Sequence, residues 1–197
     1  MNIEPNLIAL ARDTASRNGL DPAIVCAIVD QESAWDSHAM RYEGAFRAKY
    51  VAPLGLSPTE EIARSISWGL MQVMGQVARE HGFAEKFLSA LCEPEAGVTV
   101  GCAVFAEKLA LAERELSAVS APGGTAGSQC ISACKTATLG CVSIGAPRCP
   151  DHGAPADATP AGSPTRPELH RRALQLWNGG ANAAYADQVL EHVARYR

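Results

Sequence analysis

The chain has 197 residues, enough for one domain that buries a core without disulfides or a bound metal. Its formal net charge is −4, so it lacks the excess of basic residues that binding to nucleic acid or to an anionic membrane surface requires. There is no apolar run of about 18 residues, the minimum for a membrane span, and the first residues carry acids where a signal peptide has a basic region. We expect no nucleic acid partner and no membrane span, and synthesis in the cytoplasm without a signal peptide.

Helical signals dominate the first half of the chain. Asp21 followed by Pro22 is typical of an N-cap with proline at the first helical position, and predicts a helix that runs toward Ser33. Ser67 is a candidate N-cap for a second helix over residues 68–83, with Gly82 as its stop.

Two further helices are predicted downstream. One begins at Pro94 and covers residues 94–116, and the last follows Asn182. Their apolar residues recur every three or four positions, as on one face of a helix: Val98, Cys102, Phe105 and Leu109 in the first, and Tyr185, Val189, Val193 and Tyr196 in the second. Strand patterns are nearly absent, so the predicted fold class is mostly α.

Residues 119–166 differ from the rest in composition, because they are rich in Gly, Pro, Ser, Thr and Ala and poor in large apolar side chains. Helical periodicity resumes at residues 166–177. We interpret 119–166 as a long, low-complexity insertion within one domain that spans residues 1–197.

The chain has seven cysteines, and the insertion holds four of them together with a histidine. These could be thiols in a disordered segment, two disulfides formed after export, or a zinc site, although the second cysteine pair is too widely spaced for a usual zinc motif. Cys26 and Cys102 lie on apolar helix faces and are interpreted as core residues. The four cysteines and the histidine are Cys130, Cys134, Cys141, Cys149 and His152.

The segment "IVDQESAW", residues 28–35, places a carboxylate on an apolar stripe. Glu32 follows Val25 by seven positions and so lies on the same helix face, whereas Asp30 points elsewhere and is expected to be solvated. A carboxyl group that loses water has a raised pKa and can donate a proton near neutral pH. The alternative is that Glu32 turns to solvent or pairs with Arg41 or Arg64.

Three segments in order, "QESAW", "SWGLMQVMG" and "LQLWNGGANAAY", resemble the catalytic domain of soluble lytic transglycosylases and goose-type lysozymes, and the longer spacing between the first two is similar to phage and prophage members. The resemblance covers residues 5–115 and 168–197. It implies a lysozyme-like fold that acts on peptidoglycan glycan strands at the cell wall or periplasm, with no cofactor or metal. It also leaves room for a place in a phage lysis system, a phage particle or a secretion assembly.

The resemblance implies that Glu32 is the catalytic acid. Trp177 stands where the family usually has Tyr, which keeps a ring for stacking on a sugar but removes a hydroxyl group. The substrate-binding residues that we expect are Ser33, Glu43, Ser67, Gly69, Met71, Gln72, Trp177, Asn178 and Tyr185.

The resemblance also suggests the reaction. A lytic transglycosylase uses one carboxyl group as acid and then base, cleaving the MurNAc–GlcNAc β-1,4 bond and forming 1,6-anhydro-MurNAc. A hydrolysing muramidase needs a second carboxylate, for which Asp36 and Glu43 are candidates. Asp36 would share the face of Glu32 only if the helix continued past Trp35, and for Glu43 we favour an ion pair with Arg41 or Arg47. The single-acid transglycosylase is therefore our hypothesis, with a muramidase or a non-catalytic peptidoglycan-binding module as alternatives.

Overall fold

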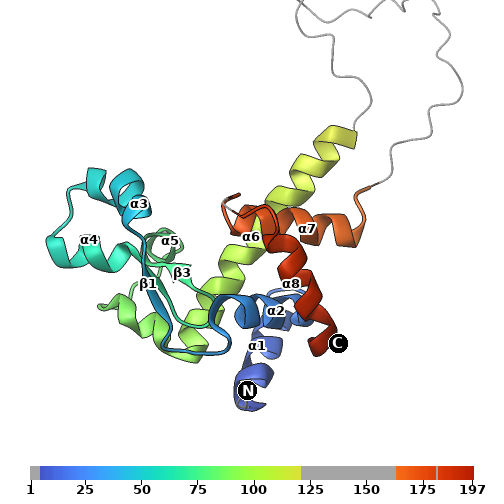
Figure 1. The fold of residues 1–197 in the computed structure, drawn as a ribbon, viewed down its shortest axis with the longest axis horizontal. Helices are drawn as coiled ribbons and strands as arrows, with labels where there is room; N and C mark the ends of the chain where they lie inside the picture. The colour runs from blue at the N-terminus through green and yellow to red at the C-terminus, as the bar shows by residue number, and fades with distance from the viewer. Residues whose placement is uncertain (1–4, 121–162, 181) are drawn as a thin grey trace, which may run out of the picture.

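The computed structural model describes residues 5–120, 163–180 and 182–197, and over these residues the fold is mostly helical, as predicted (Figure 1). The letter η marks π and 3-10 helical turns. The elements in chain order are α1 (Pro5–Arg17), α2 (Pro22–Ser33), β1 (Met40–Tyr42), α3 (Gly44–Phe46), η1 (Arg47–Val51), η2 (Ala52–Leu54), α4 (Pro58–Arg64), β2 (Ile66–Trp68), β3 (Val73–Met74), α5 (Gly75–Glu80), η3 (Leu88–Cys92), α6 (Pro94–Ser120), α7 (Arg166–Trp177), α8 (Tyr185–Val193) and η4 (Ala194–Tyr196).

The long helix α6 runs through the molecule and organises it. Figure 1 shows α3, α4 and the small sheet on one side of α6, and α1, α2 and α8 on the other. Helix α7 packs on α6, α8 packs on α2, and α1 packs on both α2 and α6. The helices after residue 163 therefore complete a core that the first 120 residues begin.

The helix α2 agrees with its prediction at both ends. Asp21 caps it by accepting a hydrogen bond from the backbone N–H of Ala23 at 2.9 Å, and the helix ends at Ser33. Every residue from 23 to 29 is buried, so α2 is the central helix of the core. The predicted apolar faces of α6 and α8 are also confirmed, with Phe105 and Val189 almost completely buried.

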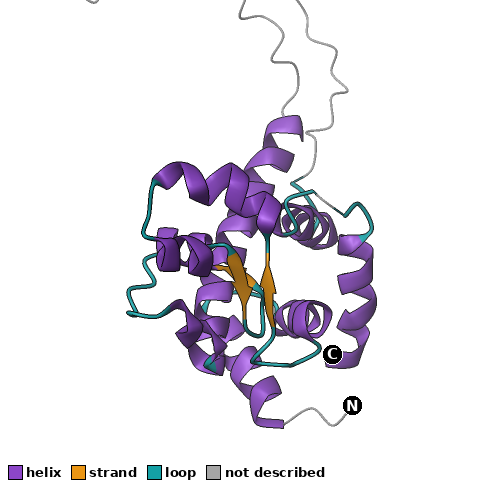
Figure 2. Ribbon diagram, turned by 60° about the vertical axis from the view of Figure 1, so that its left-hand side comes forward, coloured by secondary structure: helices purple, strands orange, loops and turns teal. Residues whose placement is uncertain are grey.

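The prediction of a helix over residues 68–83 is wrong for the first half of that range. A three-stranded antiparallel sheet in the order β1-β2-β3 is present there, with Met40 opposite Trp68 and Ser67 opposite Met74, and only α5 is helical (Figure 2). The turn between β2 and β3 contains two residues with positive φ, Gly69 at +66° and Gln72 at +47°, which a right-handed helix excludes. Strands of two or three residues are too short for a period of two to be visible in the sequence.

Asp30 was also predicted wrongly, since it is not solvated. Its side chain is 12% exposed and pairs with His192 Nδ1 at 2.7 Å and Arg195 Nη1 at 2.9 Å. These contacts join α2 to the C-terminal helical segment.

The predicted insertion is bounded by helices, because α6 continues to Ser120 and α7 begins at Arg166. Residues 121–162, with their four cysteines and His152, lie outside the described residues. Cys26 and Cys102 are completely buried in the core, as predicted. None of the described helices is both long and apolar enough to cross a membrane.

Candidate active site

Glu32 lies in the last turn of α2, where the chain turns sharply out of the helix. Ala34 and Trp35 both have positive φ, at +50° and +68°, and so end the helix at Ser33, one residue after Glu32. The hydroxyl group of Ser33 donates to the carbonyl oxygen of Leu70 at 2.9 Å, which attaches this helix end to the turn between β2 and β3.

The carboxylate of Glu32 accepts two hydrogen bonds from residues that follow it by more than 140 positions. The Tyr185 hydroxyl donates to Oε1 at 2.6 Å, and the Trp177 indole Nε1–H donates to the same oxygen at 3.0 Å. Trp177 is the last residue of α7 and Tyr185 the first of α8. The packing of α7 on α6 and of α8 on α2 thus brings all three side chains together.

Burial raises the pKa of Glu32 above its ordinary value, against the opposing effects of the hydrogen bonds from Tyr185 and Trp177 and of the positive charge of Arg41. The predicted alternative of an ion pair does not occur among the described residues. Arg41 pairs with Glu43 at 2.5 Å and Arg64 pairs with Glu60 at 2.8 Å. Glu32 is therefore a partly buried carboxyl group that holds its proton to a higher pH than an exposed glutamate does.

Glu32 opens into a cavity of about 350 Å³ between the sheet and α6 and α7. The cavity brings together six of the predicted site residues. Its wall is formed by Glu32, Arg41, Glu43, Phe46, Ser67, Gln72, Val73, Met74, Val77, Val104, Lys108, Leu176, Trp177, Asn178 and Gly179.

Four predicted site residues do not line this cavity. Met71 is completely buried, and Gly101 on α6 has no room for a side chain because a Cβ atom there would meet the Met71 sulfur at 2.3 Å. A Cβ atom on Gly69 would lie 2.3 Å from the carbonyl oxygen of Leu91, so this glycine admits a neighbouring backbone. The other two, Ser33 and Tyr185, act through their hydrogen bonds to Leu70 and Glu32.

Gln72 and Ser67 hold the cavity wall in place. The Gln72 amide donates to the carbonyl oxygens of Ala39 and Gly69, each at 2.9 Å, and accepts from the Ser67 hydroxyl at 2.9 Å. Because these bonds span the segment before β1 and the β2–β3 turn, Gln72 fixes the floor beside Glu32.

The two candidate second carboxylates lie in different surroundings. The helix stops before Asp36, whose side chain accepts from the backbone N–H of His38 and does not line the cavity. Glu43 does line the cavity, paired with Arg41 as we favoured. The other expected partner of Glu43, Arg47, pairs with Glu61 instead.

Arg41, Phe46 and Lys108 are among the residues of the cavity wall that sequence reasoning did not predict. Lys108 follows Val104 by one helical turn, so the apolar periodicity of α6 contained a signal for it. Arg41 lies in the three-residue strand β1, and Phe46 lies at the end of the three-residue helix α3. Elements this short have no sequence pattern that would indicate either residue.

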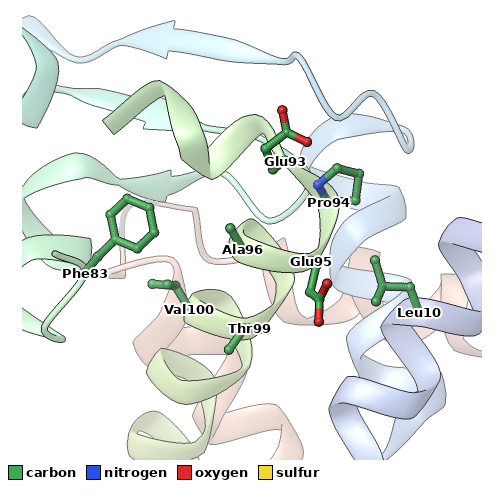
Figure 3. Close-up of a pocket in the computed structure, with 8 residues that line it drawn as sticks. All are labelled: Leu10, Phe83, Glu93, Pro94, Glu95, Ala96, Thr99 and Val100. Atoms are coloured by element: carbon green, nitrogen blue, oxygen red, sulfur yellow. The ribbon is translucent and has the colours of Figure 1, made fainter. Parts of the chain in front are cut away.

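A second cavity, of about 640 Å³, lies between α1, the loop after α5 and the start of α6. Figure 3 shows its two carboxylates, Glu93 and Glu95, pointing away from each other. Phe83, Leu10 and Val100 form much of the remaining wall. This larger space lacks the converging donors that surround Glu32, so we assign the chemistry to the smaller cavity. No three His, Cys, Asp or Glu side chains within the described ranges are placed to hold a metal ion.

Comparison with protein families gives a match to the family model described as Transglycosylase SLT domain, over residues 9–125. The matched range includes Glu32 and the turn from Gly69 to Gln72, and it ends before Trp177 and Tyr185. Comparison with curated proteins and with solved structures gave no match.

Proposed function

Because this chain belongs to the SLT transglycosylase domain family, whose members degrade peptidoglycan, we propose that it cleaves the MurNAc–GlcNAc β-1,4 bond of the glycan strand and forms 1,6-anhydro-MurNAc. The site of action is the cell wall or periplasm, where peptidoglycan lies. The catalytic domain comprises both described parts of the chain. The family match covers residues 9–125, and the C-terminal part supplies Trp177 and Tyr185, which donate hydrogen bonds to Glu32.

One observation carries this proposal: Glu32 lies in a cavity wall with a raised pKa, two hydrogen-bond donors and no ion-pair partner among the described residues. A carboxyl group in this state holds its proton to a higher pH than an exposed glutamate does, and it can give that proton to a leaving oxygen. A residue that served only solubility would be exposed or paired with a base.

The reaction proceeds through Glu32 in two roles. As an acid, its carboxyl group protonates the glycosidic oxygen while the bond from that oxygen to C1 of MurNAc breaks, and GlcNAc leaves with a new hydroxyl group. As a base, the resulting carboxylate takes the proton of the C6 hydroxyl while O6 forms a bond to C1. Glu32 ends protonated, and no water is consumed.

The other predicted residues of the cavity wall serve the substrate. Trp177 offers a ring to a sugar, and Asn178, at the C-terminal end of α7, offers an amide. Gln72 and Ser67 form hydrogen bonds with each other and with the backbone. Their main role is therefore to hold the cavity wall in place, and contact with the substrate is secondary.

A hydrolysing muramidase is the second candidate, because Glu43 lines the same cavity as Glu32. In that reaction a second carboxylate activates water or attacks C1. The ion pair of Glu43 with Arg41 at 2.5 Å weakens this candidate, since the guanidinium group already binds the carboxylate.

The test is mass spectrometry of the soluble products from purified peptidoglycan incubated with wild type, Glu32→Gln and Glu93→Gln. Glu93 lines the second cavity and is the matched control. We expect anhydro-muropeptides from wild type and from Glu93→Gln, and none from Glu32→Gln. A wild-type protein that sediments with peptidoglycan but releases no product would instead be a binding module.

A further inference from the structure

Glu32 receives both of its hydrogen bonds on one oxygen atom. Trp177 Nε1 lies 3.0 Å from Oε1 and the Tyr185 hydroxyl lies 2.6 Å from it, while no residue in the described part of the chain donates to Oε2. A carboxylate oxygen has two lone-pair sites, so the two donors occupy both sites of Oε1.

Both groups remain able to donate over the working pH range. An indole N–H is a donor only. Burial and the neighbouring Glu32 carboxylate raise the pKa of Tyr185, so its hydroxyl group keeps its proton. Both groups can therefore donate to Oε1 in every protonation state of Glu32.

We propose that Trp177 is a positioning residue that acts through Glu32: with Tyr185 it saturates Oε1, so that Oε2 carries the proton that is transferred. This inference rests on the proposed role of Glu32 and deepens it, because it assigns the reacting atom. A proton on Oε1 would displace one of the two donors or force the Tyr185 hydroxyl group to turn and accept, whereas a proton on Oε2 leaves both bonds unchanged.

The surroundings of Trp177 support this role. Its ring meets the Phe105 ring edge-on, with centroids 5.9 Å apart, and this contact holds the indole N–H toward Glu32. The position is one where the resemblance leads us to expect a tyrosine hydroxyl group. Here the indole N–H supplies the donor, and the ring still lines the cavity.

The bond from Trp177 also opposes the effect of burial on the acid. Hydrogen bonds to the charged form favour it, so the indole N–H lowers the pKa of Glu32 that burial raises. The charged groups of the same cavity wall are Arg41 and Glu43, which pair with each other, and Lys108 on α6. Removing the indole N–H should leave Glu32 protonated to a higher pH.

The first experiment uses the wild-type chain and requires no turnover. The chain has three tryptophans, so a ¹⁵N–¹H NMR spectrum contains three indole signals that can be followed through a pH titration. We expect the Trp177 signal to move with the same midpoint as the ¹³C carboxyl signal of Glu32, and to stay still in Glu32→Gln. A Trp177 indole signal that moves no more than that of Trp68 would overturn the inference.

The second experiment compares Trp177→Phe with Trp68→Phe. Trp68 is the matched control, because its indole N–H donates to the backbone oxygen of Ala63 at 3.0 Å and does not line the cavity. We expect Trp177→Phe to lower kcat about ten-fold, to move the alkaline limb of its pH profile to higher pH, and to change KM little, because a ring remains for the sugar. Trp68→Phe should keep the wild-type profile.

The outcomes separate this inference from the proposed function. An unchanged pH profile in Trp177→Phe would contradict the positioning role while leaving Glu32 as the acid. Full activity in Glu32→Gln would contradict the proposed function, whereas the indole titration would still establish the contact.

Discussion

The Tyr185 hydroxyl group donates a 2.6 Å hydrogen bond to Oε1 of Glu32 across 153 positions of sequence. Tyr185 opens α8, which packs on α2, and its side chain is almost completely buried. The bond therefore joins the environment of the proposed acid to the packing of the C-terminal helices. The C-terminal helices therefore contribute to the surroundings of Glu32 as well as to the core.

Replacing Tyr185 with Phe removes this donor and keeps the ring in the core. The loss of a hydrogen bond to the charged form raises the pKa of Glu32, so its alkaline limit of activity moves to higher pH. We expect turnover to fall by about 10- to 100-fold with the fold retained. The rate of product release from peptidoglycan between pH 4 and 9 measures turnover and its alkaline limit, and circular dichroism of the same samples shows whether the fold is retained.

Tyr196→Phe is the matched control for this change. Tyr196 is equally buried, and its hydroxyl group accepts from the Trp35 indole at 2.8 Å without contacting Glu32. We expect it to lower the free energy of unfolding by about 1 kcal/mol and to leave the pH profile as in wild type. A pH shift of equal size in both variants would mean that Tyr185 acts only through stability.

Glu32→Gln should stabilise the folded protein at neutral pH. In the folded state the pKa of Glu32 lies above its unfolded value, so the stability that its proton contributes is complete below the unfolded pKa and is lost as pH rises through the folded pKa. Glutamine remains neutral and still offers a carbonyl oxygen to Trp177 and Tyr185. Calorimetry should give a higher Tm for the variant at pH 7 and no such gain at pH 4; an equal gain at both would contradict the raised pKa.

Glu43→Gln separates the two candidate reactions. If Glu43 only pairs with Arg41, the variant should form anhydro products at a rate within about ten-fold of wild type. In a muramidase that uses Glu43 as its second carboxylate, the variant should lose activity as Glu32→Gln does. Initial rates of turbidity clearing for the two variants make the comparison.

Gly69→Ala tests the turn that follows β2. Gly69 and Gly82 both have positive φ, at +66° and +80°, but an added Cβ atom meets the Leu91 carbonyl oxygen only at Gly69 and has open space at Gly82. We expect Gly82→Ala to cost about 1 kcal/mol of unfolding free energy, and Gly69→Ala at least twice that. Urea denaturation measures both, and equal costs would mean that the Leu91 contact relaxes freely.

The helices of the core were predictable because their signals are local. The cap at Asp21, the proline at position 94 and the apolar face of α8 each lie within a few turns of sequence, and each is confirmed. The sheet was not predictable, since β1 through β3 have two or three residues each and rest on turn geometry at Gly69 and Gln72. The apolar residues around that turn therefore suggested a helix.

The hydrogen bonds around Glu32 were less predictable than its position. The burial of Glu32 was predictable because a charge on the apolar face of α2 is visible in the sequence, whereas its contacts with Trp177 and Tyr185 depend on how α7 and α8 pack. The resemblance gave both residues as substrate-binding, but the donor from Trp177 could not be inferred from a hydroxyl group that this chain lacks. Asp30 was missed for the same reason, because its partners His192 and Arg195 lie at the other end of the chain.

The most direct test of the central claim is to digest peptidoglycan with the wild-type protein in ¹⁸O-labelled water and to weigh the products by mass spectrometry. If the C6 hydroxyl of MurNAc attacks C1 while Glu32 acts as acid and then base, the products should end in 1,6-anhydro-MurNAc and contain no ¹⁸O. Reducing-end MurNAc carrying one ¹⁸O atom would show that water attacks instead, and would contradict the transglycosylase.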